Sequence, residues 1–479
     1  MNTIQRLSSV ISMVLIFSFI GPLTIFAENN KEIMDESIYD LLVDRYFNKT
    51  IKNDFEVNAN DPSKFAGGDF LGVKEKLTHI QKMGFTLVSL GPVFSTDTYD
   101  GKRVLDYTFF ERHFGTEDEF KSLLKEAHDK KINVVVDFPI QRVSDQHVWR
   151  KDSSKSDWII ENGDGTIDWN LDNPKAQKAL IESASEFVKT YNVDGLRLTA
   201  IEGVDALFLN EMIQSLKATK PDLYVLSNEE SDAAFDLKVI DKQEDVYRNI
   251  FKNVDLPSND FEKTLENSLV VRAVDTINDK RFTADAAEEN MFPPTRWKMV
   301  LAMLMSVPGV PVMTYGSEIA MNGEKPPESN QIMNYKIEEE LMDYIADLQL
   351  MRNGSDALRR GKIEMLHNDN GFMVYKRWNE EETWIVAINN TGKTQQFDLS
   401  DEVIGDNKEL RGLFQSDILR QREDGSYRIV LDRELAEFFP VTEQKGFNKG
   451  YLAALALVYI LFLGFLYLVW RKGKNKKQA

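Results

Sequence analysis

The sequence predicts a (β/α)8 barrel, an α/β fold of the TIM type, followed by a small all-β domain. Over some 300 residues from Asp35 onward, short apolar runs alternate with amphipathic stretches. The run at 132–137 is almost continuously apolar, as in a parallel sheet covered on both faces. Near Arg352 the pattern changes to strands without helices between them. We therefore expect a barrel over 35–351 and a β domain over 352–442.

The barrel elements follow in chain order. Strands are expected at 38–46, 86–90, 132–137, 195–200, 223–227, 269–274 and 310–314. Helices are expected at 73–83, 120–130, 176–191 and 297–307, where apolar residues recur at helical spacing. A short excursion at about 141–173 follows the third strand. In the β domain, strands are expected at 371–378, 383–390, 396–399 and 427–431, with a charged turn at 379–382.

Composition and charge restrict the possible functions. The chain has 479 residues, no cysteine and five histidines, so disulfides, thiol catalysis and cysteine-bound zinc are excluded. It carries 58 basic and 77 acidic residues, a net charge of -19, which makes nucleic acid an improbable partner. Six of the basic residues and none of the acidic ones lie in 1–27 and 471–479, so the remaining body carries -25.

Both ends of the chain resemble membrane-targeting segments. Residues 1–27 contain Arg6, an apolar run and a terminal Ala27, the parts of a cleaved signal peptide; the alternative is an uncleaved anchor. Residues 451–470 contain no charge, which predicts one transmembrane helix. The basic tail at 471–479 would lie in the cytoplasm. We therefore expect a single-pass protein at the cell surface, with its bulk outside the cell.

The motifs at the expected strand ends resemble those of the α-amylase family of glycoside hydrolases (family 13). The resemblance runs from about Ser37 to Thr391 and includes Phe65-Ala-Gly-Gly-Asp-Phe-Leu-Gly72. Other matching stretches are Asp106-Tyr107, His113-Phe-Gly-Thr116, Pro308-Gly-Val-Pro and Tyr315-Gly-x-Glu318. The family cleaves glycosides with retention, through a carboxylate nucleophile and a carboxylic acid/base about 5 Å apart. A third acid helps to bind the distorted sugar.

The resemblance places these three roles on particular residues. Thr199 stands at the nucleophile position, within Gly195-Leu-Arg-Leu-Thr-Ala200, and its hydroxyl needs an adjacent base before it can attack. Glu229 stands at the acid/base position, with Glu230 as a shifted alternative; a solvated loop without a catalytic role is the other interpretation of this pair. Asn278 stands at the third acid position, one residue before Asp279. Two of the three expected acids are therefore absent.

The expected substrate-binding residues are Tyr99, Asp100 and Arg197. By resemblance Tyr99 stacks on sugar, Asp100 replaces a histidine, and Arg197 orients the nucleophile. Two of these residues also have purely structural interpretations: Arg197 could pair with a neighbouring carboxylate, and Tyr99 could be packing. No metal site and no cofactor are predicted, because Gln141 replaces a calcium ligand of the family. Trp158 and Trp169 could stack on sugar rings or fill a small core.

Three functions remain open at this point. The favoured one is a degenerate member of the family that binds a glycan, such as an α-glucan, without normal glycosidase activity. One alternative is an active α-glucan hydrolase or transglycosidase with rearranged carboxylates. The other is an accessory domain that docks another membrane protein.

Overall fold

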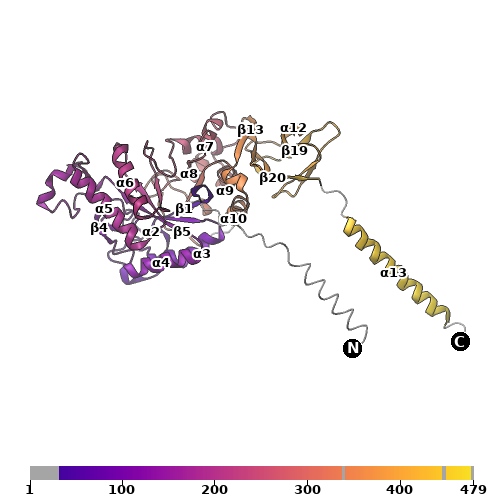
Figure 1. Cartoon of the computed structure of the whole chain (residues 1–479), viewed down its shortest axis with the longest axis horizontal. Coiled ribbons are helices and arrows are strands. Elements are labelled where there is room, and N and C mark those ends of the chain that lie inside the picture. The colour runs from indigo at the N-terminus through magenta and orange to yellow at the C-terminus, as the bar shows by residue number, and fades with distance from the viewer. Residues whose placement is uncertain (1–31, 337–339, 445–448, 476–479) are drawn as a thin grey trace.

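The computed structural model describes residues 32–336, 340–444 and 449–475. The predicted signal peptide at 1–27 lies outside the described residues. Figure 1 shows the barrel first, from the start of the described chain through α10 (Glu340–Asn353), followed by a β domain and a final helix, α13. The expected order of the first two parts is therefore present.

Seven parallel strands form the barrel sheet, in the order β10-β9-β5-β2-β1-β12-β11. Their bounds are β1 (Ile38–Asp40), β2 (Leu87–Pro92), β5 (Asn133–Pro139), β9 (Gly195–Thr199), β10 (Tyr224–Ser227), β11 (Val271–Arg272) and β12 (Val310–Thr314).

The sixth strand position is taken by an irregular segment, 236–240. The Asp236 amide donates to the Val225 carbonyl of β10, and Lys238 pairs with Val270 beside β11. Only residues 228–235 separate this segment from β10, so no helix lies between the fifth and sixth positions. The barrel therefore closes here without a regular strand and without its outer helix.

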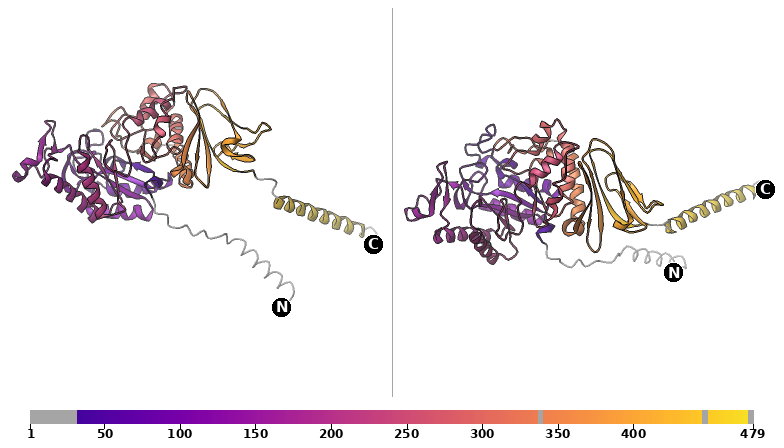
Figure 2. Two further views of the ribbon diagram at one scale, coloured as in Figure 1. Left: turned by 45° about the horizontal axis from the view of Figure 1, so that its top comes forward. Right: turned by 90° about the horizontal axis from the view of Figure 1, so that it is seen from above.

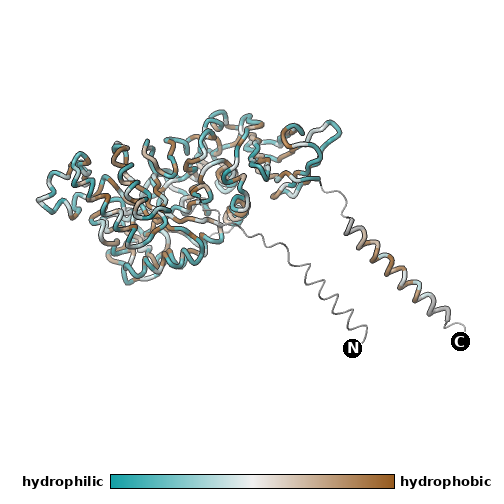
Figure 3. Tube along the Cα trace, in the orientation of Figure 1, coloured by the Kyte–Doolittle hydropathy of each residue, from teal (hydrophilic) through white to brown (hydrophobic). Residues whose placement is uncertain are grey.

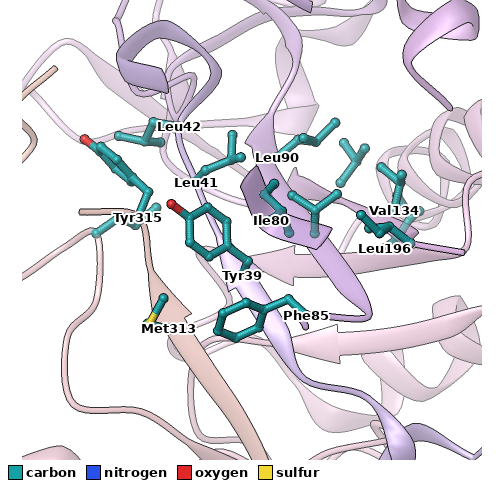
Figure 4. Close-up of a cluster of buried hydrophobic side chains, with 14 of the residues drawn as sticks. Tyr39, Leu41, Leu42, Ile80, Phe85, Leu90, Val134, Leu196, Met313 and Tyr315 are labelled. Atoms are coloured by element: carbon teal, nitrogen blue, oxygen red, sulfur yellow. The ribbon is translucent and has the colours of Figure 1, made fainter. Parts of the chain in front are cut away.

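The outer helices cover the sheet with apolar faces. They are α3 (Phe70–Lys82), α4 (Glu117–Asp129), α5 (Pro174–Tyr191), α6 (Ala206–Thr219), α7 (Gln243–Phe251), α8 (Phe282–Glu288), α9 (Pro293–Leu304) and α10 (Glu340–Asn353). Hydrophobic and hydrophilic residues alternate along α3 and α4 in Figure 3. Figure 4 shows Tyr39, Leu90, Val134, Leu196 and Met313 in the buried cluster beneath the helices. These strand residues point outward, so their immediate neighbours point into the barrel.

A separate apolar cluster fills the lower part of the barrel interior. Its buried members include Ile38, Leu87, Val135, Leu226 and Val312, each contributed by a different strand. Because side chains alternate along a strand, residues two positions further on also face inward, nearer the carboxyl ends of the strands. Asp40 and Asp137 occupy such positions, as does Arg197 on β9, which places them under the barrel mouth.

The first and seventh strands are shorter than the sequence predicts. The expected strand at 38–46 ends at Asp40, and α2 (Val43–Tyr46) follows at once. This turn lets the buried Asp44 carboxylate accept hydrogen bonds from the amides of Ala66 and Gly67. The expected strand at 269–274 is reduced to Val271–Arg272. Apolar runs alone could not predict these ends, because both depend on contacts that are distant in the sequence.

The excursion after the third strand forms a small sheet of its own. Two strands of this sheet, β6 (Val143–Ser144) and β7 (Ile159–Glu161), flank β8 (Thr166–Trp169). Trp158 is 8% and Trp169 1% exposed, and both rings pack against Trp149. These tryptophans fill a small core. A second hairpin, β3 (Phe94–Thr96) and β4 (Val104–Phe110), precedes α4.

The β domain begins after α11 (Asp356–Arg360) and has its own core. Its larger sheet has the order β13-β14-β15-β20-β17-β18, and β16 pairs with β19. The bounds are β13 (Lys362–Asp369), β14 (Phe372–Trp378), β15 (Thr383–Asn389), β16 (Gln395–Leu399), β17 (Lys408–Arg411), β18 (Ile418–Arg420), β19 (Tyr427–Leu431) and β20 (Leu435–Glu443), with α12 (Asp401–Ile404) after β16. Figure 2 shows the domain against the barrel, where Arg296 of α9 donates to Asn390.

The predicted membrane span at 451–470 falls within α13 (Lys449–Asn475). Several side chains of this helix, including those at 451, 452, 469 and 471–475, lie outside the described residues. Among the residues that are described, no helix has the length and apolar character needed to cross a membrane.

Candidate functional site

A cavity of about 1140 Å³ opens at the carboxyl ends of the barrel strands. This is the end at which barrel enzymes carry their active sites. Its wall combines carboxylates with apolar side chains such as Ile160, Trp169 and Leu207. Thr199, Glu229 and Asn278 all line it, as does Asp100. The structure therefore brings the three family catalytic positions to one cavity.

Beneath this cavity, Arg197 is held between two buried carboxylates. Its Nη1 and Nη2 lie 3.0 and 2.9 Å from the two oxygens of Asp40. Its Nε and Nη2 lie 2.7 and 2.8 Å from the two oxygens of Asp137. Two roles were left open for Arg197: orientation of the nucleophile and pairing with a neighbouring carboxylate. The structure shows the pairing. Two bidentate pairs occupy most of the guanidinium donors.

Burial and charge oppose each other in this cluster. Burial by itself would lower the pKa of Arg197, but Asp137 and Asp40 outweigh it and raise that pKa above its ordinary value. Burial raises the pKa of Asp137, and the attraction of Arg197 only partly offsets it. One cation thus serves two buried acids, and the cluster carries a net charge of -1 when both are ionised.

Glu229 is bound to the backbone beside the nucleophile position. Its Oε1 accepts the Ala200 amide at 2.8 Å, and its Oε2 accepts the Ile201 amide at 2.9 Å. Ala200 adopts a positive φ of 53°, a conformation in which the two successive amides point to one carboxylate. Both carboxyl oxygens of Glu229 are therefore engaged by the backbone.

Asn278 is connected across the mouth to the loop between β3 and β4. Lys102 donates from Nζ to Asn278 Oδ1 at 2.7 Å and lies 3.4 Å from Asp100 Oδ2. The side-chain oxygen of Asn278, at the third acid position, therefore accepts a hydrogen bond from Lys102. The Lys102 side chain spans part of the mouth. Asp100 contributes to this bridge.

Tyr99 is buried away from the cavity. The guanidinium of Arg45 lies 4.0 Å from the centre of its ring, and Asn330 donates to its hydroxyl at 3.2 Å. Burial raises the pKa of this tyrosine. Because Arg45 covers the ring face, the structure displays the packing role left open for Tyr99.

Gln141, which replaces a calcium ligand of the family, binds the backbone of Trp169. Gln141 Oε1 accepts the Trp169 amide at 2.6 Å, and its Nε2 donates to the Trp169 carbonyl at 3.1 Å. Gln141 thus ties the excursion to the end of β5. Within the described ranges, no group of three or more His, Cys, Asp or Glu residues could hold a metal ion.

Sequence reasoning missed Asp40 and Lys102. Asp40 lies on β1, two residues after the inward-facing Ile38, so strand alternation was the signal that could have placed it in the barrel. Lys102 follows the Tyr99-Asp100-Gly101 motif, but its distance from Asn278 along the chain left no local signal. The two alternatives, Glu230 and Asp279, line a second cavity and not the mouth.

Comparison with known families agrees with this architecture. The family described as "Alpha amylase, catalytic domain" matches residues 26–166, and "Alpha-amylase C-terminal domain" matches residues 361–439. A curated relative, the Beta/alpha-amylase of Paenibacillus polymyxa, is 29% identical over 413 residues. That match covers 76% of this chain, which spans only about a third (34%) of the relative. A cyclomaltodextrinase from Geobacillus thermopakistaniensis is 24% identical, with 70% of this chain and 64% of the relative covered.

Solved structures give a match over most of this chain. An α-amylase from Anoxybacillus is 34% identical with a TM-score of 0.83, and one from Geobacillus thermoleovorans, complexed with acarbose, is 31% identical with a TM-score of 0.81. Each match covers 87% of this chain and 100% of the other. On this identity and coverage, the chain belongs to the α-amylase family of glycoside hydrolases.

Proposed function

We propose that this protein binds α-glucans in the barrel mouth and does not cleave them at a normal glycosidase rate. One observation carries the second half of this proposal: both oxygens of Glu229 accept backbone amides beside Thr199. An acid catalyst must hold a proton that it can give to the leaving oxygen. In the structure both carboxyl oxygens of Glu229 are held by backbone amides instead.

The nucleophile position supports the same proposal. Thr199 has an uncharged hydroxyl, and among the described residues no carboxylate or histidine forms a hydrogen bond with it. A hydroxyl nucleophile needs such a base. The third acid position also supports the proposal. The family has an acid there, whereas this chain has Asn278, which accepts a hydrogen bond from Lys102.

The proposed ligand class rests on the cavity and on the relatives. A cleft of this size, with the exposed Ile160 and Leu207 among its lining residues, offers apolar surface to sugar rings and carboxylates to their hydroxyls. The relatives include maltogenic amylases and cyclomaltodextrinases, and one similar structure is complexed with acarbose. Retention of the ligand with loss of the chemistry is the function that fits both.

Calorimetry and product analysis on the purified full chain test this proposal together. We expect maltoheptaose and acarbose to bind with measurable heat. We expect sugar release to be slower by about 10⁴-fold or more than with the Geobacillus thermoleovorans α-amylase, the order of loss when one member of a catalytic unit is absent. Release at the rate of that enzyme would contradict the proposal and favour the active hydrolase. Absence of binding heat would also contradict it and would favour a protein partner.

Glu229→Gln is the matched variant for this experiment. Its amide nitrogen would face the amide of Ala200 or Ile201, so we expect a loss of about 1–3 kcal/mol in the free energy of unfolding. A proton donor poised over a substrate would tolerate this isosteric change without loss of stability. Unchanged thermal unfolding would therefore count against the backbone role.

We also propose that the barrel and the β domain lie outside the cell, tethered by the C-terminal segment. The support is the sequence alone: the uncharged stretch at 451–470, the basic tail and the signal-like start. Protease treatment of intact cells is expected to digest an epitope in the β domain and to spare one at the C-terminus. Protection of both epitopes would overturn this location.

A further inference from the structure

The mouth cavity does not extend over the whole rim of the barrel. Its wall includes the ends of β2, β5 and β9 and residues that follow β10 and β11. Among the described residues, none of β1, of β12 or of the loops after these two strands lines it. In the sheet, β1 and β12 lie side by side between β2 and β11. The cavity therefore stops short of one arc of the rim, above β1 and β12.

The contact between Lys102 and Asn278 marks this border of the cavity. Lys102 lies in a loop that follows β2 and β3, and Asn278 follows β11. Lys102 Nζ donates to Asn278 Oδ1 at 2.7 Å, and both residues line the mouth. Because β2 and β11 flank β1 and β12, this bridge separates the ends of the two middle strands from the rest of the mouth.

Buried contacts connect the same two segments below the surface. Asn330, from the loop after β12, donates to the Tyr99 hydroxyl at 3.2 Å and to the Ile277 carbonyl at 3.0 Å. The Arg45 guanidinium covers the Tyr99 ring. Asn330 is 2% and Tyr99 8% exposed, whereas the Lys102 side chain is 44% exposed. Packed side chains therefore fill this arc, and Lys102 closes it at the surface.

The loop that carries Lys102 is held by contacts of its own. Thr96 Oγ1 donates to the Arg103 carbonyl at 3.0 Å and accepts the Thr98 amide at 3.2 Å. Arg103 Nη2 donates to the Gly165 carbonyl of the excursion at 2.8 Å. The Lys102 side chain therefore extends toward Asn278 from a backbone that is already held in place, which lowers the entropic cost of the bridge.

The opposite arc of the mouth offers apolar side chains to the solvent. Ile160 of β7 and Leu207 of α6 line the cavity and are 49% and 77% exposed. A glucan chain can leave the mouth past these residues, but the bridge obstructs an exit over β1 and β12. A chain that passes through a cleft needs two exits, whereas a chain that ends in the cleft needs only one.

We propose that Lys102 makes the mouth selective for the free end of an α-glucan chain, an inference that rests on the proposed α-glucan binding. A chain end enters past Ile160 and Leu207 and stops at the bridge. An internal stretch of chain continues beyond this point and has to displace Lys102 from Asn278. Lys102 is thus a specificity-determining residue of the site.

Titration calorimetry with maltoheptaose and β-cyclodextrin tests this selectivity in the purified full chain. The two sugars have the same number of glucose units, but the cyclic one has no chain end. We expect β-cyclodextrin to bind at least about 10-fold more weakly, because it has to break a hydrogen bond made by a charged group. Lys102→Ala is expected to reduce this preference by about 10-fold. Asn278→Ala should have the same effect, and the double variant no larger one, since the two residues form one contact.

Amylose of uniform length provides a linear ligand and removes the effect of ring curvature. Sedimentation of the wild type with amylose is expected to give one protein per chain, whatever the length of the chain. The Lys102→Ala variant is expected to load several proteins on a chain, in a number that increases with length. Loading of the wild type in proportion to chain length would contradict the proposal.

Lys125→Ala provides the matched control. Lys125 is an exposed lysine that pairs with Asp129 on α4 and does not line the mouth, so this variant should keep the wild-type preference. Thermal unfolding of each variant checks that the fold is retained. Equal affinity of the wild type for the two sugars, or a preference unchanged by Lys102→Ala, would overturn the role of Lys102 and leave α-glucan binding intact. Absence of maltoheptaose binding in both the wild type and Lys102→Ala would refute α-glucan binding itself, and the role of Lys102 with it.

Discussion

Replacement of Arg197 by glutamine is expected to lower the free energy of unfolding by about 3–5 kcal/mol at neutral pH. The guanidinium donates to both oxygens of Asp40 and of Asp137, and all three side chains are at least nine-tenths buried. The variant leaves two carboxylates close together in the barrel without a cation. Buried charges that lose their partner account for the largest penalties of this kind. Chemical denaturation at pH 7 measures the loss.

The penalty is also expected to depend on pH. Burial already raises the pKa of Asp137 above its ordinary value of 3.8 in the folded protein. Loss of the neighbouring cation raises it further. The folded variant then takes up protons at a higher pH than the unfolded chain does, so its stability relative to the wild type increases as the pH falls. We expect the difference between the two proteins to be largest at pH 7 and to shrink toward pH 4.

Arg428→Gln is the control for this prediction. Arg428 makes a bidentate pair with Asp398 at 2.7 Å for both contacts, but both side chains are more than a third exposed. An exposed pair contributes about 0–1 kcal/mol, so this variant should be nearly neutral. Equal losses for the two variants, or a loss at Arg197 that does not change with pH, would contradict the buried-cluster interpretation.

The fold was predictable where local patterns determine it. The strand at Val310–Thr314 and the helix at Pro174–Tyr191 appear almost as expected, because a continuous apolar run and a helical apolar repeat are local signals. The sixth barrel position was not predicted. Residues 236–240 pair through isolated backbone hydrogen bonds to Val225 and to residues beside β11, and such pairing leaves no periodic signal in the sequence.

The sequence indicated which positions to compare at the barrel mouth, but it did not indicate their contacts. The family motifs directed attention to Thr199, Glu229 and Asn278, and all three line one cavity. Their partners come from elsewhere in the chain. Asp40 is 157 residues from Arg197, and Lys102 is 176 residues from Asn278. Side-chain hydrogen bonds between such distant residues depend on the closed barrel, so a motif cannot reveal them.

The position of Asp40 suggests how the barrel tolerates Thr199. In the family pattern, an arginine at the position of Arg197 faces a carboxylate two residues later on the same strand. In this chain Thr199 stands at that position. Asp40, at the end of β1, binds the guanidinium instead. Asp40 of β1 thus takes the place of that carboxylate beside Arg197, and the cluster has one cation for two carboxylates.

Restoration of the acid by Thr199→Asp is therefore expected to destabilise the protein by about 1–3 kcal/mol, because a third carboxylate would join a cluster with one cation. Residues 197 and 199 share a face of β9, so the new carboxylate would lie near Arg197. Asp40→Asn in the same chain restores the original charge and frees two guanidinium donors. We expect the double variant to recover most of the loss, with an interaction energy of about 1–3 kcal/mol in a double-mutant cycle.

The same pair of variants also tests the chemistry. Neither is expected to release sugar from maltoheptaose, because Glu229 remains bound to the amides of Ala200 and Ile201, and Lys102 remains on Asn278. Additive effects on stability would show that Asp40 does not stand in for the missing acid. Hydrolysis by the double variant would show that Glu229 leaves the backbone and serves as the acid, so that the proposed lack of activity would rest on Thr199 alone.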